Sequence, residues 1–73
     1  MKSAQTPVHL TVRQFAEKHR AYTLGGLRYL IFHAHENGLD DARAILRLGR
    51  KVLIDEARFF AWVELQNHHR FAA

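Results

Sequence analysis

The sequence has no cysteine, so neither a disulfide bond nor a thiolate zinc site is available to stabilise the fold. It has one proline, no internal repeat and no low-complexity segment. No window approaches the roughly 18 consecutive apolar residues of a membrane span. Residues 1–10 carry one lysine and lack the apolar run of a signal peptide, and we therefore expect a cytoplasmic protein.

Groups of residues suited to catalysis or metal binding are also missing. Ser3 is the one serine and lies in a ragged polar start, while the neighbouring carboxylates Asp40 and Asp41 fall in an expected loop. None of the six histidines stands four residues from another, as a helical zinc site requires. His33 and His35 are two residues apart and point to different faces of a helix. We expect no enzyme activity, no metal site and no cofactor.

What the chain does contain is an apolar fraction of 48% with five Phe, two Tyr and one Trp, enough for one small core in 73 residues. A domain of this size buries only about 60% of the surface that its unfolded chain exposes. Eleven Lys and Arg against seven Asp and Glu give a net charge of +4. This excess favours a polyanion partner, although an evenly mixed solvated surface is the alternative.

Two amphipathic helices are predicted in the first half of the chain. Thr11 and Gln14 have the spacing of a capping box, and the apolar positions that follow predict a helix over residues 12–19. Thr23 can cap a second helix that Gly38 ends in the left-handed conformation. Two helices joined by about three residues are typical of a helix-turn-helix. The apolar positions of the second helix are Leu24, Leu27, Leu30, Ile31 and Ala34.

A β-hairpin is predicted over residues 44–54, because Gly49 interrupts a run rich in β-favouring residues. A three-residue connection would place the strand residues Leu46, Leu48, Val52 and Ile54 on one side, facing the core. A two-residue turn would instead pair Leu48 with Lys51 and bury less. Asp55 and Glu56 then begin a third helix that reaches about Asn67.

Arg28 is the leading candidate for reading DNA bases, with Tyr29 beside it in the first two turns of the second helix. Arginine pairs bidentately with guanine O6 and N7, and the start of the second helix is what reaches base edges in helix-turn-helix proteins. The alternative is that the Arg28 stem only covers apolar surface. The absent side chains of Gly25 and Gly26 would either let a phosphate approach or reflect tolerance and close packing.

Three cations surround the hairpin turn, namely Arg47, Arg50 and Lys51. Beside a DNA-reading helix they would contact phosphates or the adjacent minor groove. The alternative is that they discourage edge-to-edge aggregation. A rival function of another class is a protein-interaction module, in which the aromatic third helix (Phe59, Phe60 and Trp62) and the polar tail dock onto a partner or a second copy. Packing of these three rings in the core is the favoured alternative.

The segments VRQFAEKH, TLGGLRYLIFHAHENG and AILRLGRKVLIDEARFFAWV resemble the small winged helix-turn-helix proteins of the excisionase and MerR-like group. The resemblance spans residues 11–63. The feature most similar to that group is the glycine-broken hairpin with its cations, followed by an Asp and a helix rich in Phe and Trp. The sequence departs from the group at Gly25 and Gly26, where serine or threonine pairs are common, and in the acidic connection over residues 39–43.

The resemblance implies a mainly α fold with a small β-hairpin, in the order helix, turn, helix, β-hairpin wing, helix. Residues 1–10 would be a flexible N-terminal arm, residues 11–66 the winged helix-turn-helix domain and residues 67–73 a short C-terminal tail. It also implies a non-enzymatic protein that binds and bends double-stranded DNA near attachment sites and biases an integrase, as excisionases of mobile elements do. Relatives of similar size are transcriptional regulators, and association of several copies on DNA is a further expectation. The positions carried over are Thr23, Gly25, Gly26, Arg28, Tyr29 and His33 in the recognition helix and Arg47, Arg50 and Lys51 in the wing.

Overall fold

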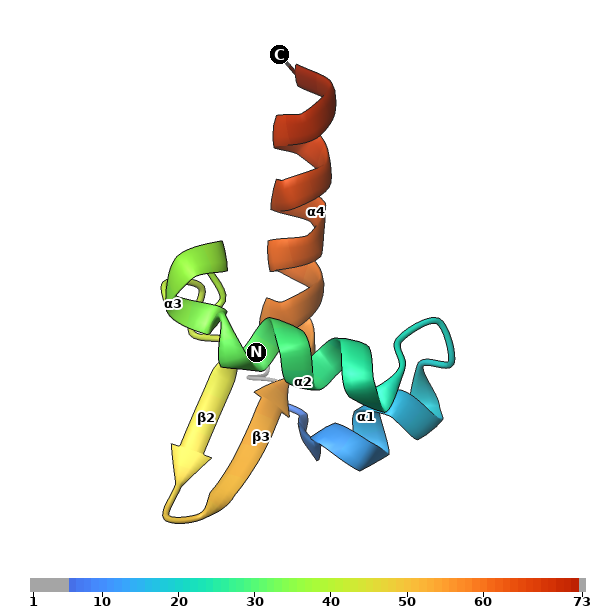
Figure 1. Cartoon of the computed structure of the whole chain (residues 1–73), viewed down its shortest axis with the longest axis vertical. Coiled ribbons are helices and arrows are strands. Elements are labelled where there is room, and N and C mark those ends of the chain that lie inside the picture. Colours follow the sequence, from blue (N-terminus) through green and yellow to red (C-terminus); the bar gives the residue numbers. More distant parts are fainter. Residues whose placement is uncertain (1–5, 73) are drawn as a thin grey trace.

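A three-stranded antiparallel sheet and four helices make up residues 6–72, the part of the chain that the computed structural model describes, with side chains described to residue 68. Strand β3 lies in the middle of the sheet, in the order β1-β3-β2. Helix α2 crosses in front of the sheet and the β2–β3 hairpin projects beyond it (Figure 1). The elements are β1 (His9–Thr11), α1 (Val12–Lys18), α2 (Leu24–Phe32), α3 (Ala34–Asn37), β2 (Ile45–Leu48), β3 (Lys51–Asp55) and α4 (Glu56–Ala72).

Three helices begin at the residues that the sequence indicates, because each has its own side-chain cap. In α1, Thr11 Oγ1 accepts from the Gln14 N–H at 3.1 Å and Gln14 Oε1 accepts from the Thr11 N–H at 2.9 Å, which confirms the capping box. Thr23 caps α2 by accepting from the Gly26 N–H at 3.0 Å. Asp55 caps α4, since its Oδ1 accepts from the Arg58 N–H at 3.1 Å.

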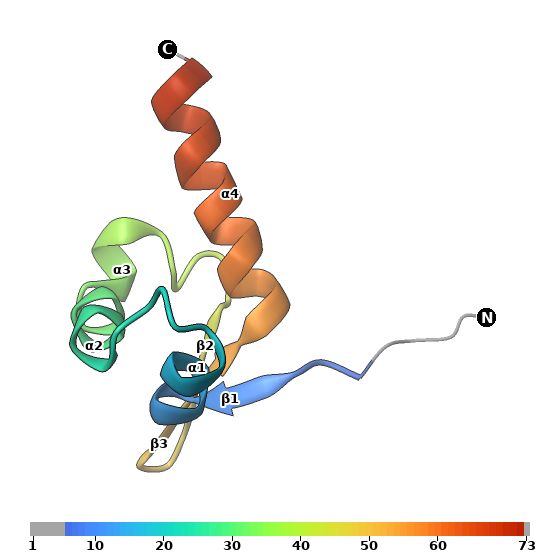
Figure 2. The same ribbon diagram turned by 90° about the vertical axis from the view of Figure 1, so that its right-hand side faces the viewer.

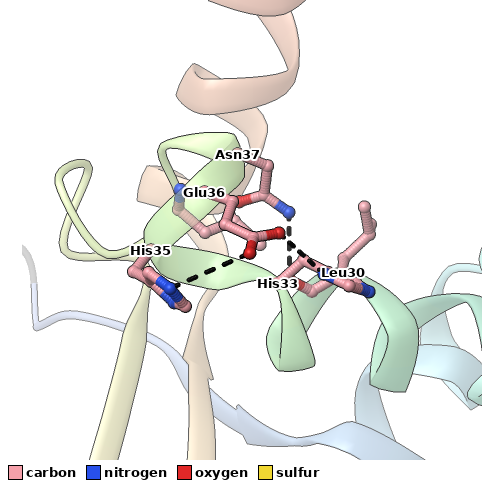
Figure 3. A network of polar contacts seen from close by, with 6 residues as sticks. Leu30, His33, His35, Glu36 and Asn37 are labelled. Carbon is pink, nitrogen blue, oxygen red and sulfur yellow. Dashed lines mark hydrogen bonds and ion pairs between the residues drawn. The ribbon is translucent and has the colours of Figure 1, made fainter.

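The prediction of one continuous second helix up to Gly38 is wrong, because the helix breaks at His33 (φ −100°, ψ 22°) and resumes as the short α3. Asn37 Nδ2 donates to the carbonyl of Leu30 at 3.0 Å across this break (Figure 3). Trp62 Nε1 donates to the Asn37 carbonyl at 2.9 Å. The break is therefore held by a residue distant in sequence, which local periodicity does not reveal. Gly38 has φ 92° and ends α3 in the expected left-handed conformation.

Strand β1 was not expected, since the sequence places residues 1–10 in an arm. Its residues pair antiparallel with β3, with Leu10 opposite Ile54. Three residues are too few for the alternation that predicts a strand. At the C-terminal end, residues 67–72 of the expected tail continue the backbone of α4, which ends at Ala72. Residues 1–5 of the expected arm and Ala73 lie outside the described residues.

The hairpin occupies the predicted position, but the three-residue connection is wrong. Its turn has two residues, Gly49 and Arg50, and pairs Leu48 with Lys51. Gly49 has φ 61° and stands at the first central position, which is the glycine requirement of a type II′ turn. The chain therefore adopts the favoured two-residue turn although this leaves Leu48 unburied, with an exposed fraction of 63%.

The core lies between one sheet face, the two helices α1 and α2, and the first two turns of α4. Phe15 and Phe59 are both fully buried, with ring centroids 4.9 Å apart, and Trp62 is 8% exposed. Core packing, which the sequence favours for these rings, is therefore confirmed for Phe59 and Trp62, so the alternative interaction surface does not include them; Phe60 is half-buried against the core. Beyond these turns α4 extends away from α2 and the hairpin (Figure 2). The core residues are Phe15, Leu27, Ala34, Leu39, Ala44, Ile45, Ile54, Phe59 and Trp62.

Candidate nucleic-acid interface

Helix α2 presents an exposed stripe on the side opposite its buried Leu27. The stripe consists of Gly25, Arg28, Tyr29 and Phe32, which recur at the i, i+3, i+4 and i+7 positions of one helix face. Tyr29 is 65% exposed and Phe32 is 79% exposed. The helix thus offers one guanidinium and two aromatic rings to the surroundings from a backbone that the core holds in place.

Arg28 and the hairpin lie on the same side of the molecule. Arg28 and Phe32 of α2 and Val52 of β3 line one open groove of about 300 Å³, which Val12 and Ile31 complete. Within the described side chains, Lys18, Arg47 and Arg58 form ion pairs with carboxylates and Arg28 does not. The guanidinium of Arg28 is therefore available beside the hairpin.

The two glycines of α2 play different parts in the structure. A Cβ on Gly26 would lie 3.0 Å from Thr23 Oγ1, so Gly26 gives the cap its close contact. Its N–H already donates to Thr23 and is not free for a phosphate. Gly25 has open space where a Cβ would stand, so a ligand backbone has room to approach there. Of the two interpretations from sequence, close packing thus fits Gly26 and phosphate approach fits only Gly25.

The three cations of the hairpin do not share one face. Arg47 pairs with Val52 across the hairpin and so lies on the face that lines the groove, but its Nη1 is 3.3 Å from Asp40 Oδ1, which offsets its charge. Lys51 directly precedes Val52 in β3, and because successive strand residues alternate between the two faces, it points to the opposite face. Arg50 occupies the exposed turn. The cationic part of the hairpin is therefore its tip, Arg50 with Lys51.

His33 is anchored within the protein more than the sequence suggests. Its Nδ1 is 2.9 Å from Glu36 Oε1, and because a carboxylate only accepts, Nδ1–H is the donor (Figure 3). Its ring packs against Tyr29 with centroids 4.4 Å apart. The half-buried His33 thus supports the exposed ring of Tyr29 rather than projecting alone.

Two further cations near α2 were not among the sequence candidates. Arg13 of α1 and Arg20 of the turn line a second depression together with Ala16, the acidic residue Glu17, and Leu24 at the start of α2. Both are exposed, and neither forms an ion pair within the described side chains. Their signal in the sequence is their place among the polar residues of α1 and of the turn that follows it.

Glu56 at the start of α4 fixes the orientation of α1, and through it that of α2. Its Oε2 accepts from Lys18 Nζ at 2.9 Å and lies 2.6 Å from His19 Nε2. These hydrogen bonds, first that from Lys18 and then that from His19, lower the pKa of Glu56 below its ordinary value of 4.5. The carboxylate thus joins the end of α1 to the helix that closes the core.

We expect Glu56→Gln to lower the melting temperature at pH 7 and to have progressively less effect in acid. A carboxyl group whose pKa is depressed in the folded state contributes stability above its unfolded value of 4.5, and this contribution is lost as the pH falls through the folded pKa. Thermal unfolding from pH 7 to pH 3 measures the difference between the two proteins. Glu64→Gln, at an exposed position of α4, is the matched control. An undiminished difference at pH 3 would argue against the ionic contact.

Other kinds of site find little support in the described part of the chain. Among those residues no three His, Cys, Asp or Glu side chains converge as metal ligands. The side chain of His69, next to His68, lies outside them. No helix between residues 6 and 72 combines the length and the apolar character needed to cross a bilayer.

The exposed α2 stripe, the groove shared with the hairpin and the cations around them form one surface, which we call the α2–hairpin surface. Its charged members without a carboxylate partner in residues 6–68 are Arg13, Arg20, Arg28 and Arg50. Lys51 adjoins this surface at the hairpin tip, from the opposite face of the hairpin. Comparison with protein-family models, curated proteins and solved structures finds no match for this chain, so its function is inferred from the geometry and charge of this surface.

Proposed function

We propose that the protein binds double-stranded DNA through the α2–hairpin surface, as a winged helix-turn-helix protein does. The observation that carries this proposal is the groove in which Arg28 of α2, which has no carboxylate partner among the described side chains, stands beside Val52 of the hairpin. Winged helix-turn-helix proteins use a helix in the major groove and a neighbouring hairpin that contacts the flanking phosphates, and Arg28 of α2 and Arg50 at the hairpin turn would take these two parts.

In this binding mode the first two turns of α2 enter the major groove. Arg28 donates two hydrogen bonds to guanine O6 and N7, and the open space at Gly25 lets the backbone of α2 approach the phosphates. Arg50 and Lys51 at the hairpin tip contact phosphates or the adjacent minor groove. Arg13 and Arg20 flank α2 on the other side and contact the backbone there.

The biological role that we propose is that of a recombination directionality factor, an excisionase that bends attachment-site DNA and biases an integrase. Its support is the order of helix, helix, cationic hairpin and closing helix, which is similar to that of the excisionase group. With few side chains at the start of α2 to read bases, DNA shape and the association of several copies contribute to specificity. A small transcriptional regulator is the alternative, and an integrase gene beside this one would favour excision.

The salt dependence of binding tests the proposal. If the four cations Arg13, Arg20, Arg50 and Lys51 contact phosphates while Arg28 contacts a base, log affinity falls with log salt at a slope of about −3.6, since each phosphate contact contributes roughly −0.9. Fluorescence anisotropy with a duplex selected from a random pool, and with an unselected duplex, gives this slope. A slope near zero on both duplexes would exclude the proposed binding mode.

A further inference from the structure

Phe32 is a large apolar side chain in a position where the fold does not use it. Its ring is 79% exposed, whereas Phe15 and Phe59 are fully buried. It stands four residues after Arg28 on the same helix face and lines the same groove. An exposed apolar ring beside an unpaired guanidinium points to a ligand that offers an apolar group close to hydrogen-bond acceptors.

The neighbours of Phe32 hold the aromatic part of this surface in place. The ring of His33 packs edge-on against Phe32 with centroids 5.0 Å apart and against Tyr29 at 4.4 Å. Glu36 in turn holds the His33 ring through the 2.9 Å contact at Nδ1. Because these rings are already held in place, the side chains of Phe32 and Tyr29 lose little conformational freedom when a ligand binds.

We propose that Phe32, with Tyr29 beside it, contacts the C5-methyl groups of thymines in the major groove. This inference rests on the proposed function and adds a base preference to it. The thymine methyl is the apolar group that the major groove displays, and phenylalanine is among the side chains that contact it. Four helical residues span about 6 Å, close to two base-pair steps. Thymine should therefore occur one or two base pairs from the guanine that Arg28 contacts.

Charge favours DNA over a second copy of the chain as the ligand of this groove. Arg28 is the charged residue among the side chains that line it. In a symmetric dimer through the same patch, each Arg28 side chain would face the positively charged patch of the other copy. The polyphosphate backbone of DNA instead complements Arg28, Arg50 and Lys51.

The test replaces thymine by deoxyuracil, which differs only in lacking the C5-methyl group, in a duplex selected by the wild-type protein from a random pool. We expect replacement of each contacted thymine to weaken binding about fourfold, which corresponds to the free energy of burying one methyl group. Phe32→Ala should bind the thymine duplex several-fold more weakly and no longer discriminate between the two duplexes. Leu65→Ala, at an exposed apolar position of α4, is the matched control and should retain the discrimination.

The outcomes separate the two proposals. Duplex binding with the expected salt slope but without loss on uracil substitution, or with Phe32→Ala still discriminating, would overturn the thymine contact alone. Absence of duplex binding would overturn the proposed function as well. A concentration-dependent dimer in sedimentation equilibrium that Phe32→Ala abolishes would show that the groove holds a second copy, and would also overturn the thymine contact.

Discussion

Arg28→Gln is expected to weaken binding of the selected duplex by about 5- to 150-fold, the range for loss of one bidentate contact to a base. The discrimination for guanine at that position should be lost with it, because glutamine cannot reproduce the two donors of the guanidinium. Anisotropy titrations against duplexes that carry each of the four bases at this position measure both effects. Since Arg28 is exposed and lies outside the core, thermal unfolding should be unchanged.

Arg58→Gln is the matched control for Arg28→Gln, because it removes the same charge from a different side of the molecule. Arg58 lies in the first turn of α4, near Val8 and Glu56 rather than near α2. We expect only a small loss of affinity from its long-range charge. Equal losses in the two variants would mean that net charge, and not a contact made by α2, accounts for binding.

Phe59→Ala is expected to cost about 3–5 kcal/mol of folding free energy, the usual range for loss of a buried aromatic ring. A chain of this length has a total stability of roughly 4–11 kcal/mol, so the variant should lose a large part of its stability and unfold at a much lower temperature. The Phe59 ring contacts Phe15, at 4.9 Å between centroids, and Trp62, at 5.8 Å, and its loss leaves a cavity between α1 and α4. Circular dichroism on heating and urea titration measure the change.

The same substitution at Phe32 is the control for Phe59→Ala. Phe32 is 79% exposed, so removal of its ring should change the free energy of unfolding by less than about 0.5 kcal/mol. Comparable losses in the two variants would contradict the division between a buried aromatic core and an exposed aromatic surface on α2.

Features fixed by neighbouring residues were predicted correctly from the sequence. The Thr11 and Thr23 caps, the left-handed Gly38 and the turn at Gly49 each depend on one or two side chains close in the chain. The exposed position of Arg28 followed from the helical period of the apolar residues around it. Such local signals were enough to order the helices and to locate the hairpin.

Features that depend on distant contacts were missed or predicted wrongly. The short helix that follows the break at His33 is tied to α4 by Trp62, which donates to Asn37 from 25 residues away and carries no local signal. Strand β1 exists because β3 offers it a partner, and its three residues carry no period of their own. Of the two hairpin connections that the sequence allows, the structure has the two-residue turn that pairs Leu48 with Lys51, because turn geometry outweighs the burial of Leu48. The groove that joins Arg28, Phe32 and Val52 needed the tertiary arrangement before it could be recognised.

The most direct test of a single DNA-binding surface is a titration of the ¹⁵N-labelled protein with the selected duplex, followed by amide chemical shifts. A surface formed jointly by α2 and the hairpin predicts that the largest shifts fall together in residues 24–33 and 47–52, with α4 beyond Val63 unaffected. Large shifts confined to α4, or in α2 without the hairpin, would contradict it.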